Sequence, residues 1–175
     1  MRLRSIGAAI LATLFMAESA SALSCVQQDL INTLEDAKAS EKLYHILVGK
    51  FVTRGPRPKS RSYSGFMSPE DQSRPKPPII TRTYFEGYSL AKHPHQDGHL
   101  SRFPVDIETS CAGPWCSNVP QSDRALIAFV EAREGQAPLL KISPCPYWTF
   151  GAKAERVEKV RQCLDKSCQP DTPDW

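Results

Sequence analysis

The six cysteines of this 175-residue chain constrain its fold more than any other feature of the sequence. They are Cys25, Cys111, Cys116, Cys145, Cys163 and Cys168. An even number of cysteines in an exported protein predicts disulfides, although six cysteines can pair in many ways. Four residues separate Cys111 from Cys116, and four also separate Cys163 from Cys168. Such short spacing allows local closure around a turn, which leaves Cys25 to pair with Cys145.

Closing the long loop between Cys25 and Cys145 would stabilise the fold most, by about 4–5 kcal/mol in the chain-entropy model. The alternative use of these cysteines is a metal or redox site. Structural zinc sites usually have C-x2-C spacing and thioredoxin-type sites need C-x-x-C, but both close pairs here are C-x4-C. We therefore interpret all six cysteines as structural disulfides.

Residues 1–22 have the three parts of a secretory signal. Arg2 and Arg4 are basic, residues 6–15 are apolar, and residues 20–22 (Ala-Ser-Ala) offer small side chains for cleavage. An apolar run of this length is too short to cross a bilayer, which takes about 20 residues. We expect cleavage near Ala22, a mature chain that starts at Leu23, and a secreted or periplasmic protein. No later segment is predicted to be transmembrane.

A cysteine this close to an export signal has an alternative fate, which is acylation as an envelope lipoprotein. Lipoprotein signals usually carry Leu three residues before the cysteine and Gly or Ala directly before it. This chain has Ala22 and Ser24 at those positions. Acylation of Cys25 would also leave one of the other five cysteines without a partner, so we favour the disulfide.

The net charge does not identify a partner. The formal charge is +3, and removal of Arg2, Arg4 and Glu18 with the signal leaves +2. Such a small excess gives no support for nucleic-acid binding, which export disfavours further. The chain contains 15 prolines, well above average usage, so we expect few long helices.

Apolar periodicity predicts a helix, five short strands and a second helix. The expected helices cover residues 27–40 (with Ser24 as N-cap) and 153–164, and the strands cover 43–52, 79–90, 103–108, 125–132 and 139–143. Turns rather than helices separate the strands, which favours an antiparallel sheet or small barrel. We expect one domain over 23–175, with a proline-rich loop at 54–78 and a frayed tail at 169–175.

Several segments resemble tissue inhibitors of metalloproteinases and related netrin-like domains. They are Ser24-Cys25-Val26 before a helix, residues 47–52 (Leu-Val-Gly-Lys-Phe-Val), 110–113 (Ser-Cys-Ala-Gly), the strand at 125–132, and 140–145 (Leu-Lys-Ile-Ser-Pro-Cys). The resemblance covers roughly residues 24–164, and bacterial secreted proteins of this type exist. It implies an all-β fold in which a five-stranded antiparallel OB-type barrel is flanked by short helices. It also supports the Cys25–Cys145 pair.

The chain departs from the animal inhibitors at its mature N-terminus. Those inhibitors begin with a cysteine whose amino group and carbonyl chelate the zinc of the protease. Here Leu23 stands where that cysteine would be, so Leu23-Ser24-Cys25 cannot reproduce this chelation. The resemblance therefore transfers the fold more safely than the function, and protease inhibition is kept as an alternative.

Residues 93–99 hold the densest group of possible metal ligands. These are His93, His95, Asp97 and His99, in what we interpret as a turn between strands. Neutral imidazoles suit copper, zinc or nickel, but Pro94 and Gly98 are also ordinary turn residues. We favour a solvated polar turn and predict neither a metal site nor a cofactor.

Residues 50–76 form a basic segment with two aromatic residues. Lys50, Arg54, Arg57, Lys59, Arg61, Arg74 and Lys76 oppose Glu70 and Asp71, which gives a local excess of +5, and Tyr63 and Phe66 lie among them. Such a segment suits an acidic protein, lipid headgroups or an anionic envelope polymer. The alternative is a solvated loop that its charge keeps extended.

Aromatic residues near disulfides form the last candidate surface. Trp115 lies between Cys111 and Cys116, and Trp148 follows Cys145 closely. Such residues usually pack on the disulfides, but if exposed they would anchor a protein interface. The sequence has no H-E-x-x-H motif, nucleophile elbow or glycine-rich phosphate loop, so we predict no enzyme. The predicted function is an exported binding module, and the alternatives are a protease inhibitor or a lipid-anchored envelope protein.

Overall fold

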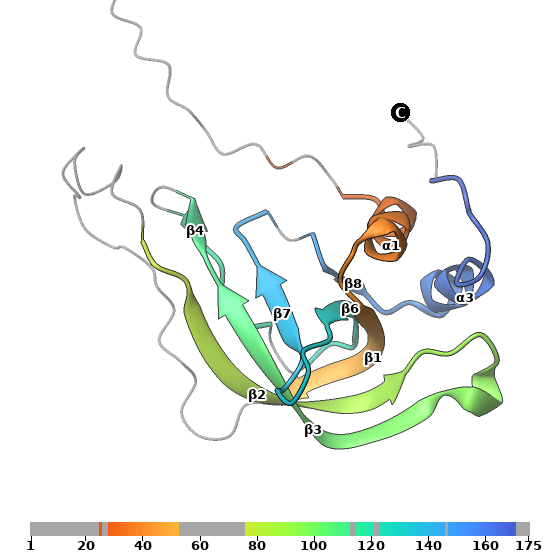
Figure 1. Ribbon diagram of the computed structural model, residues 1–175, viewed down its shortest axis with the longest axis horizontal. Helices are drawn as coiled ribbons and strands as arrows, with labels where there is room; N and C mark the ends of the chain where they lie inside the picture. The colour runs from red at the N-terminus through yellow and green to blue at the C-terminus, as the bar shows by residue number, and fades with distance from the viewer. Residues whose placement is uncertain are drawn as a thin grey trace, which may run out of the picture.

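The computed structural model describes residues 25, 28–52, 76–112, 115–120, 123–145 and 147–170. The predicted signal, Leu23, Ser24 and most of the basic segment and of the tail lie outside these residues. In chain order the elements are α1 (Leu30–Ala39), β1 (Tyr44–Val52), β2 (Ile79–Ser89), the 3-10 turn η2 (Pro94–Gln96), β3 (Gly98–Thr109), β4 (Cys111–Ala112), β5 (Trp115–Cys116), β6 (Leu126–Glu131), β7 (Leu139–Ile142), β8 (Thr149–Gly151) and α3 (Ala154–Gln162) (Figure 1).

Five strands close into a barrel in the order β1-β2-β3-β7-β6, because β1 pairs with β2 on one edge and with β6 on the other. The predicted five-stranded OB-type barrel with flanking helices is therefore confirmed. The prediction that it is wholly antiparallel is wrong, since β3 and β7 run parallel. The reason is geometric. Strand directions cannot alternate around a closed ring with an odd number of strands, so at least one neighbouring pair must be parallel.

Two glycines allow β1 and β2 to approach closely where they cross. Gly49 and Gly87 are register partners. A Cβ on Gly49 would lie 2.1 Å from the carbonyl oxygen of Glu86, and one on Gly87 would lie 2.2 Å from that of Val48. Gly87 also has a φ of +155° and adjoins a register shift in the β2–β3 ladder. Neither position accepts a side chain without backbone movement.

The apolar side chains form two packed layers. One layer fills the barrel and includes Phe51, Phe85 and Ile107. The other lies between the barrel wall and the helices, where Leu34 of α1 and Phe129 of β6 are buried. Figure 1 shows α1 and α3 on the same side of the barrel. β1 and β6 are thus covered on both faces, which explains their nearly continuous apolar sequences.

Asp29 is the N-cap of α1, so the predicted N-cap at Ser24 is wrong. Its side-chain oxygen accepts hydrogen bonds from the amides of Ile31 at 2.8 Å and Asn32 at 2.9 Å. The helix begins at Leu30 rather than at residue 27. Aspartate satisfies free amides of the first turn as well as serine does, and Asp29 lies directly before the apolar stripe.

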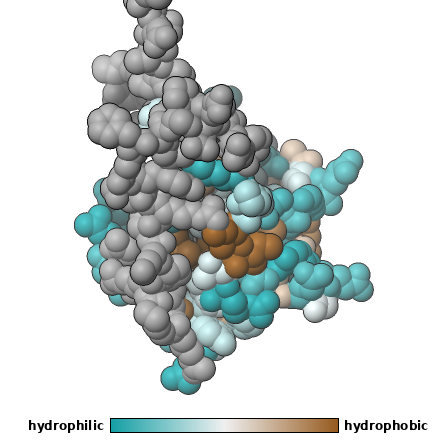
Figure 2. All heavy atoms as spheres, turned by 90° about the vertical axis from the view of Figure 1, so that its left-hand side faces the viewer, coloured by the Kyte–Doolittle hydropathy of each residue, from teal (hydrophilic) through white to brown (hydrophobic). Residues whose placement is uncertain are grey.

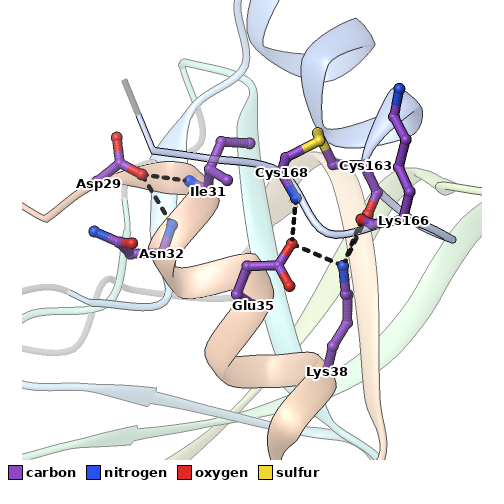
Figure 3. Close-up of polar contacts among 8 residues, drawn as sticks. All are labelled: Asp29, Ile31, Asn32, Glu35, Lys38, Cys163, Lys166 and Cys168. Atoms are coloured by element: carbon purple, nitrogen blue, oxygen red, sulfur yellow. Dashed lines mark hydrogen bonds and ion pairs between the residues drawn. A yellow bond between two sulfur atoms is a disulfide. The ribbon is translucent and has the colours of Figure 1, made fainter. Parts of the chain in front are cut away.

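Polar contacts tie the end of α3 to α1 (Figure 3). The ammonium of Lys38 donates to the carbonyl oxygens of Cys163 at 3.0 Å and Lys166 at 2.9 Å. Glu35 accepts from Lys38 at 2.8 Å and from the amide of Cys168 at 3.2 Å. The Cys163–Cys168 disulfide thus closes a turn whose backbone is held on α1.

The three disulfides join the predicted partners: Cys25–Cys145, Cys111–Cys116 and Cys163–Cys168. The pairing prediction is confirmed, and the described residues include no free cysteine. Three details were not predicted. β4 and β5 form a two-residue hairpin and β8 has three residues, both too short for a periodic pattern. β3 begins at Gly98 rather than at residue 103, because pairing with β2 orders a stretch whose side chains are mostly exposed.

Candidate functional site

Three large apolar side chains are exposed at one end of the barrel, and we call them the rim. They are Ile79, Ile80 and Trp115, exposed by 40%, 57% and 46%. Ile79 pairs with Thr109, the last residue of β3, and the hairpin with Trp115 follows two residues later. Figure 2 shows an apolar patch on the face of the molecule that carries the start of β2. Clustered exposed apolar residues mark interaction surfaces more often than scattered ones do.

Strand alternation explains why Ile79 and Ile80 are both exposed. Along β2, Thr83 and Phe85 are buried in the barrel. Ile79 belongs to this inward-facing set but lies at the barrel's end, whereas Ile80 faces outward. The rim therefore combines an apolar side chain at the barrel opening with one on the outer wall.

Two disulfides fix the backbone at this end. Cys111–Cys116 closes the hairpin that carries Trp115. The next residue, Ser117, accepts a hydrogen bond from the Ser110 amide at 3.0 Å, and its hydroxyl donates to the Ile142 carbonyl at 2.6 Å. Cys25–Cys145 attaches the N-terminal part of the chain just beyond β7. The rim thus lies on a rigid support.

A cleft of about 490 Å³ opens beside the rim. It lies between the end of β7 and the start of β6, where these strands have separated, since their only register pair among the described residues is Glu131 with Leu139. Leu126 and Ile142 line it and belong to the barrel layer. Asn118, Asp123 and Arg124 add polar groups, so the cleft carries a carboxylate as well as a guanidinium.

Most of the basic segment lies outside the residues that the structure describes. Arg54, Arg57, Lys59, Arg61, Tyr63 and Phe66 all lie outside them. The chain leaves the described part after Val52 of β1 and re-enters at Lys76, three residues before Ile79. Binding by this segment stays a prediction from sequence.

Trp115 and Trp148 do not form a common aromatic surface, which the sequence analysis kept as the alternative to packing. Trp148 is half-buried and stacks on Tyr44, with ring centroids 4.8 Å apart. It also packs against both apolar layers, including Phe129. Trp148 therefore serves the core, and only Trp115 is free to act at the surface.

The 93–99 turn uses its carboxylate for structure. Asp97 forms two hydrogen bonds with the Arg161 guanidinium, at 2.8 and 2.7 Å, and accepts a third from the Ala91 amide at 2.8 Å. The bonds from Arg161 hold the pKa of Asp97 below its ordinary value. His93 and His95 are exposed, with ring centroids 5.5 Å apart, and His99 is in β3. Among the described residues, no three His, Cys, Asp or Glu side chains are grouped to hold a metal ion.

The chain was compared with protein-family models, curated proteins and solved structures, and none of them matches it. The site therefore has to be interpreted from its own geometry. In the part of the chain that the structure describes, no helix is both long enough and apolar enough to span a bilayer.

Sequence reasoning missed Ile79, Ile80 and Arg124. A signal was present for the first two, because adjacent residues of a strand face opposite sides. Two consecutive isoleucines at a strand start therefore cannot both enter the same core. Arg124 gave no signal, since a single arginine in a loop is common on protein surfaces.

Proposed function

We propose that this protein is an exported, non-catalytic module that binds another protein through the rim. The observation that carries the proposal is the gathering of Ile79, Ile80 and Trp115 at the end of the barrel that two disulfides fix. Rigid apolar and aromatic side chains are the usual anchors of protein interfaces. Ordering them costs little on binding because their backbone is already fixed.

The basic segment supports an acidic partner. It joins β1 to β2, so its charge excess is covalently attached a few residues before Ile79. Positive charge beside an apolar contact accelerates association with an acidic surface and makes it sensitive to salt. An anionic envelope polymer would use the same charges but would gain nothing from the rim, so we favour a protein.

The test is the recovery of partners from cells that export the protein naturally. A variant with Ile80→Asp and Trp115→Ala should lose a crosslinked partner that the wild type retains. Leu43→Asp is the matched control. Leu43 is 68% exposed, but it directly precedes β1, at the end of that strand opposite the rim. Recovery of the same partners with both variants would overturn the proposal. Replacing Arg54, Arg57, Lys59 and Arg61 with Ser should weaken recovery most at low salt.

Protease inhibition is the second candidate, and the Cys25–Cys145 bond is the observation that favours it. This bond attaches the N-terminal segment to the rim's end of the barrel, where the resemblance implies contact with a protease. An inhibitor of this kind would slow a zinc metalloprotease in proportion to its concentration, and removal of Leu23 would change its potency. Unchanged protease rates at saturating protein would exclude this candidate.

Lipid anchoring and the Cys25–Cys145 bond exclude one another, because one sulfur cannot form both. An intact mass six hydrogens below the reduced form, for a chain that starts at Leu23, would support the unanchored protein. A mass increased by acyl chains on Cys25 would instead support the envelope lipoprotein.

A further inference from the structure

We infer that the cleft beside the rim binds an extended peptide segment that carries a carboxylate for Arg124. This site is distinct from the rim, and the inference does not rest on the proposed function. It rests on two strand edges that face the cleft and on the chemistry of the side chains between them.

The first edge belongs to β7. The carbonyls of Pro138 and Ile142 accept hydrogen bonds from β3 and from Ser110, so even-numbered residues here turn their backbone groups toward β3. Alternate residues of a strand turn to the opposite edge. The backbone groups of Lys141 and Ser143 therefore point away from β3, and β7 has no register partner there among the described residues. Ser143 lines the cleft.

The second edge belongs to β8. The Phe129 amide of β6 donates a hydrogen bond to the Trp148 carbonyl at 2.9 Å. With the β6–β8 register, this bond shows that the backbone groups of even-numbered residues in and next to β8 point toward β6. The backbone groups of Thr149 consequently point away from β6, and Thr149 also lines the cleft. Unpaired edges of this kind are templates for the addition of a strand.

The side chains of the cleft define the ligand. Leu126 and Ile142 offer an apolar surface for every second residue of an extended chain. Arg124 and its neighbour Asp123 are both exposed at the cleft, and within the described residues no hydrogen bond or ion pair engages the Arg124 guanidinium. A carboxylate accepts two parallel hydrogen bonds from arginine, so an Asp or Glu side chain or a C-terminal carboxylate fits best. The volume of about 490 Å³ is within the range of peptide and small-ligand sites.

The probe is a synthetic peptide chosen by selecting a phage-displayed library of random heptapeptides on the wild-type protein. We expect enriched sequences with alternating apolar residues and one acidic residue. Arg124→Ala should weaken binding of the selected peptide roughly tenfold or more, since hydrogen bonds to charged groups contribute about 1.5–3 kcal/mol. Arg156→Ala is the matched control, because Arg156 is an exposed arginine of α3 that does not line the cleft.

N-methylation of the peptide tests strand addition without changing the protein. Alternate amides of an extended segment point to opposite edges, so methylation in either set should weaken the binding of a peptide that lies between β7 and β8. Peptides without an acidic residue, equal affinity for both arginine variants, or unchanged binding after methylation at every position would each overturn the inference. Peptide binding that Ile80→Asp abolishes would also overturn it, since this result places the peptide on the rim. Retention of peptide binding by that variant separates this site from the proposed function.

Discussion

The two ends of the long β2–β3 hairpin are stabilised by different chemistry. At the rim end, the Cys25–Cys145 and Cys111–Cys116 bonds fix the backbone while apolar side chains remain exposed. At the tip, between Ser89 and Gly98, the ion pair of Arg161 with Asp97 joins the hairpin to α3. This ion pair is largely withdrawn from solvent, with the two side chains exposed by 9% and 15%.

This difference supports the proposal that the rim end binds a partner. The tip uses its charged groups internally, as the contacts of Asp97 with Arg161 and with the Ala91 amide show. The rim end obtains its rigidity from covalent bonds, so its side chains need not contribute to stability. A surface can then keep apolar groups for a partner without losing its conformation.

Removal of the Cys25–Cys145 bond should cost the most stability. In the chain-entropy model a loop of this length contributes about 4–5 kcal/mol, and the Cys111–Cys116 loop contributes about 2 kcal/mol. Urea unfolding of the variant with Cys25→Ser and Cys145→Ser should therefore show roughly twice the loss of the variant with Cys111→Ser and Cys116→Ser. Equal losses in the two variants would mean that loop closure is not what stabilises the rim end.

Breaking the ion pair at the tip should have the next largest effect. Arg161→Ala leaves the carboxylate of Asp97 poorly solvated and without its cationic partner, which typically costs about 3 kcal/mol for a buried pair. Arg156→Ala on the same helix is exposed and should change the free energy of unfolding by less than about 0.5 kcal/mol. Urea denaturation measures the free energy of unfolding of both variants. Similar losses would mean that the ion pair of Arg161 with Asp97 does not stabilise the tip.

The sequence predicted the two short disulfides and the main strands well because these depend on local information, whereas the barrel and the Cys25–Cys145 pair were supported by the family resemblance. The spacing of Cys111 from Cys116 identifies a local pair, and apolar runs such as residues 125–132 identify central strands. β6 is central, since it pairs with β1, β7 and β8. The parallel β3–β7 pair was missed because it follows from ring closure and not from either strand alone.

The site was predicted less well because exposure depends on where a strand ends relative to the barrel. Trp115 and Trp148 both lie near disulfides in sequence, yet one is exposed and the other stacks on Tyr44. The role of Asp97 depends on Arg161, which lies 64 residues away in the chain. The cleft arises from the divergence of β6 and β7, and no residue pattern encodes it.

Acid should weaken the tip before it affects the disulfide-fixed rim. The pKa of Asp97 is lowered by hydrogen bonds from Arg161, so this carboxylate contributes stability above its unfolded-state pKa of about 4. That contribution is lost as pH falls through the lower folded-state pKa. Urea unfolding of wild type and Asp97→Asn should differ at pH 7, and the difference should shrink as the pH falls through the lowered folded-state pKa of Asp97. A difference that stays constant or grows on acidification would contradict this assignment.

The smallest effect on stability is expected at the rim itself. Ile80 is 57% exposed and faces outward, so Ile80→Asp should change the free energy of unfolding by no more than about 0.5 kcal/mol. Ile79→Asp should cost more, because Ile79 belongs to the inward-facing set and is less exposed. Urea denaturation of the two variants measures the difference. A large loss for Ile80→Asp would mean that its side chain packs against the protein and is not reserved for a partner. A negligible loss would mean that the stability of the fold does not require an apolar side chain at this rigid edge, which is what the proposed binding by the rim predicts.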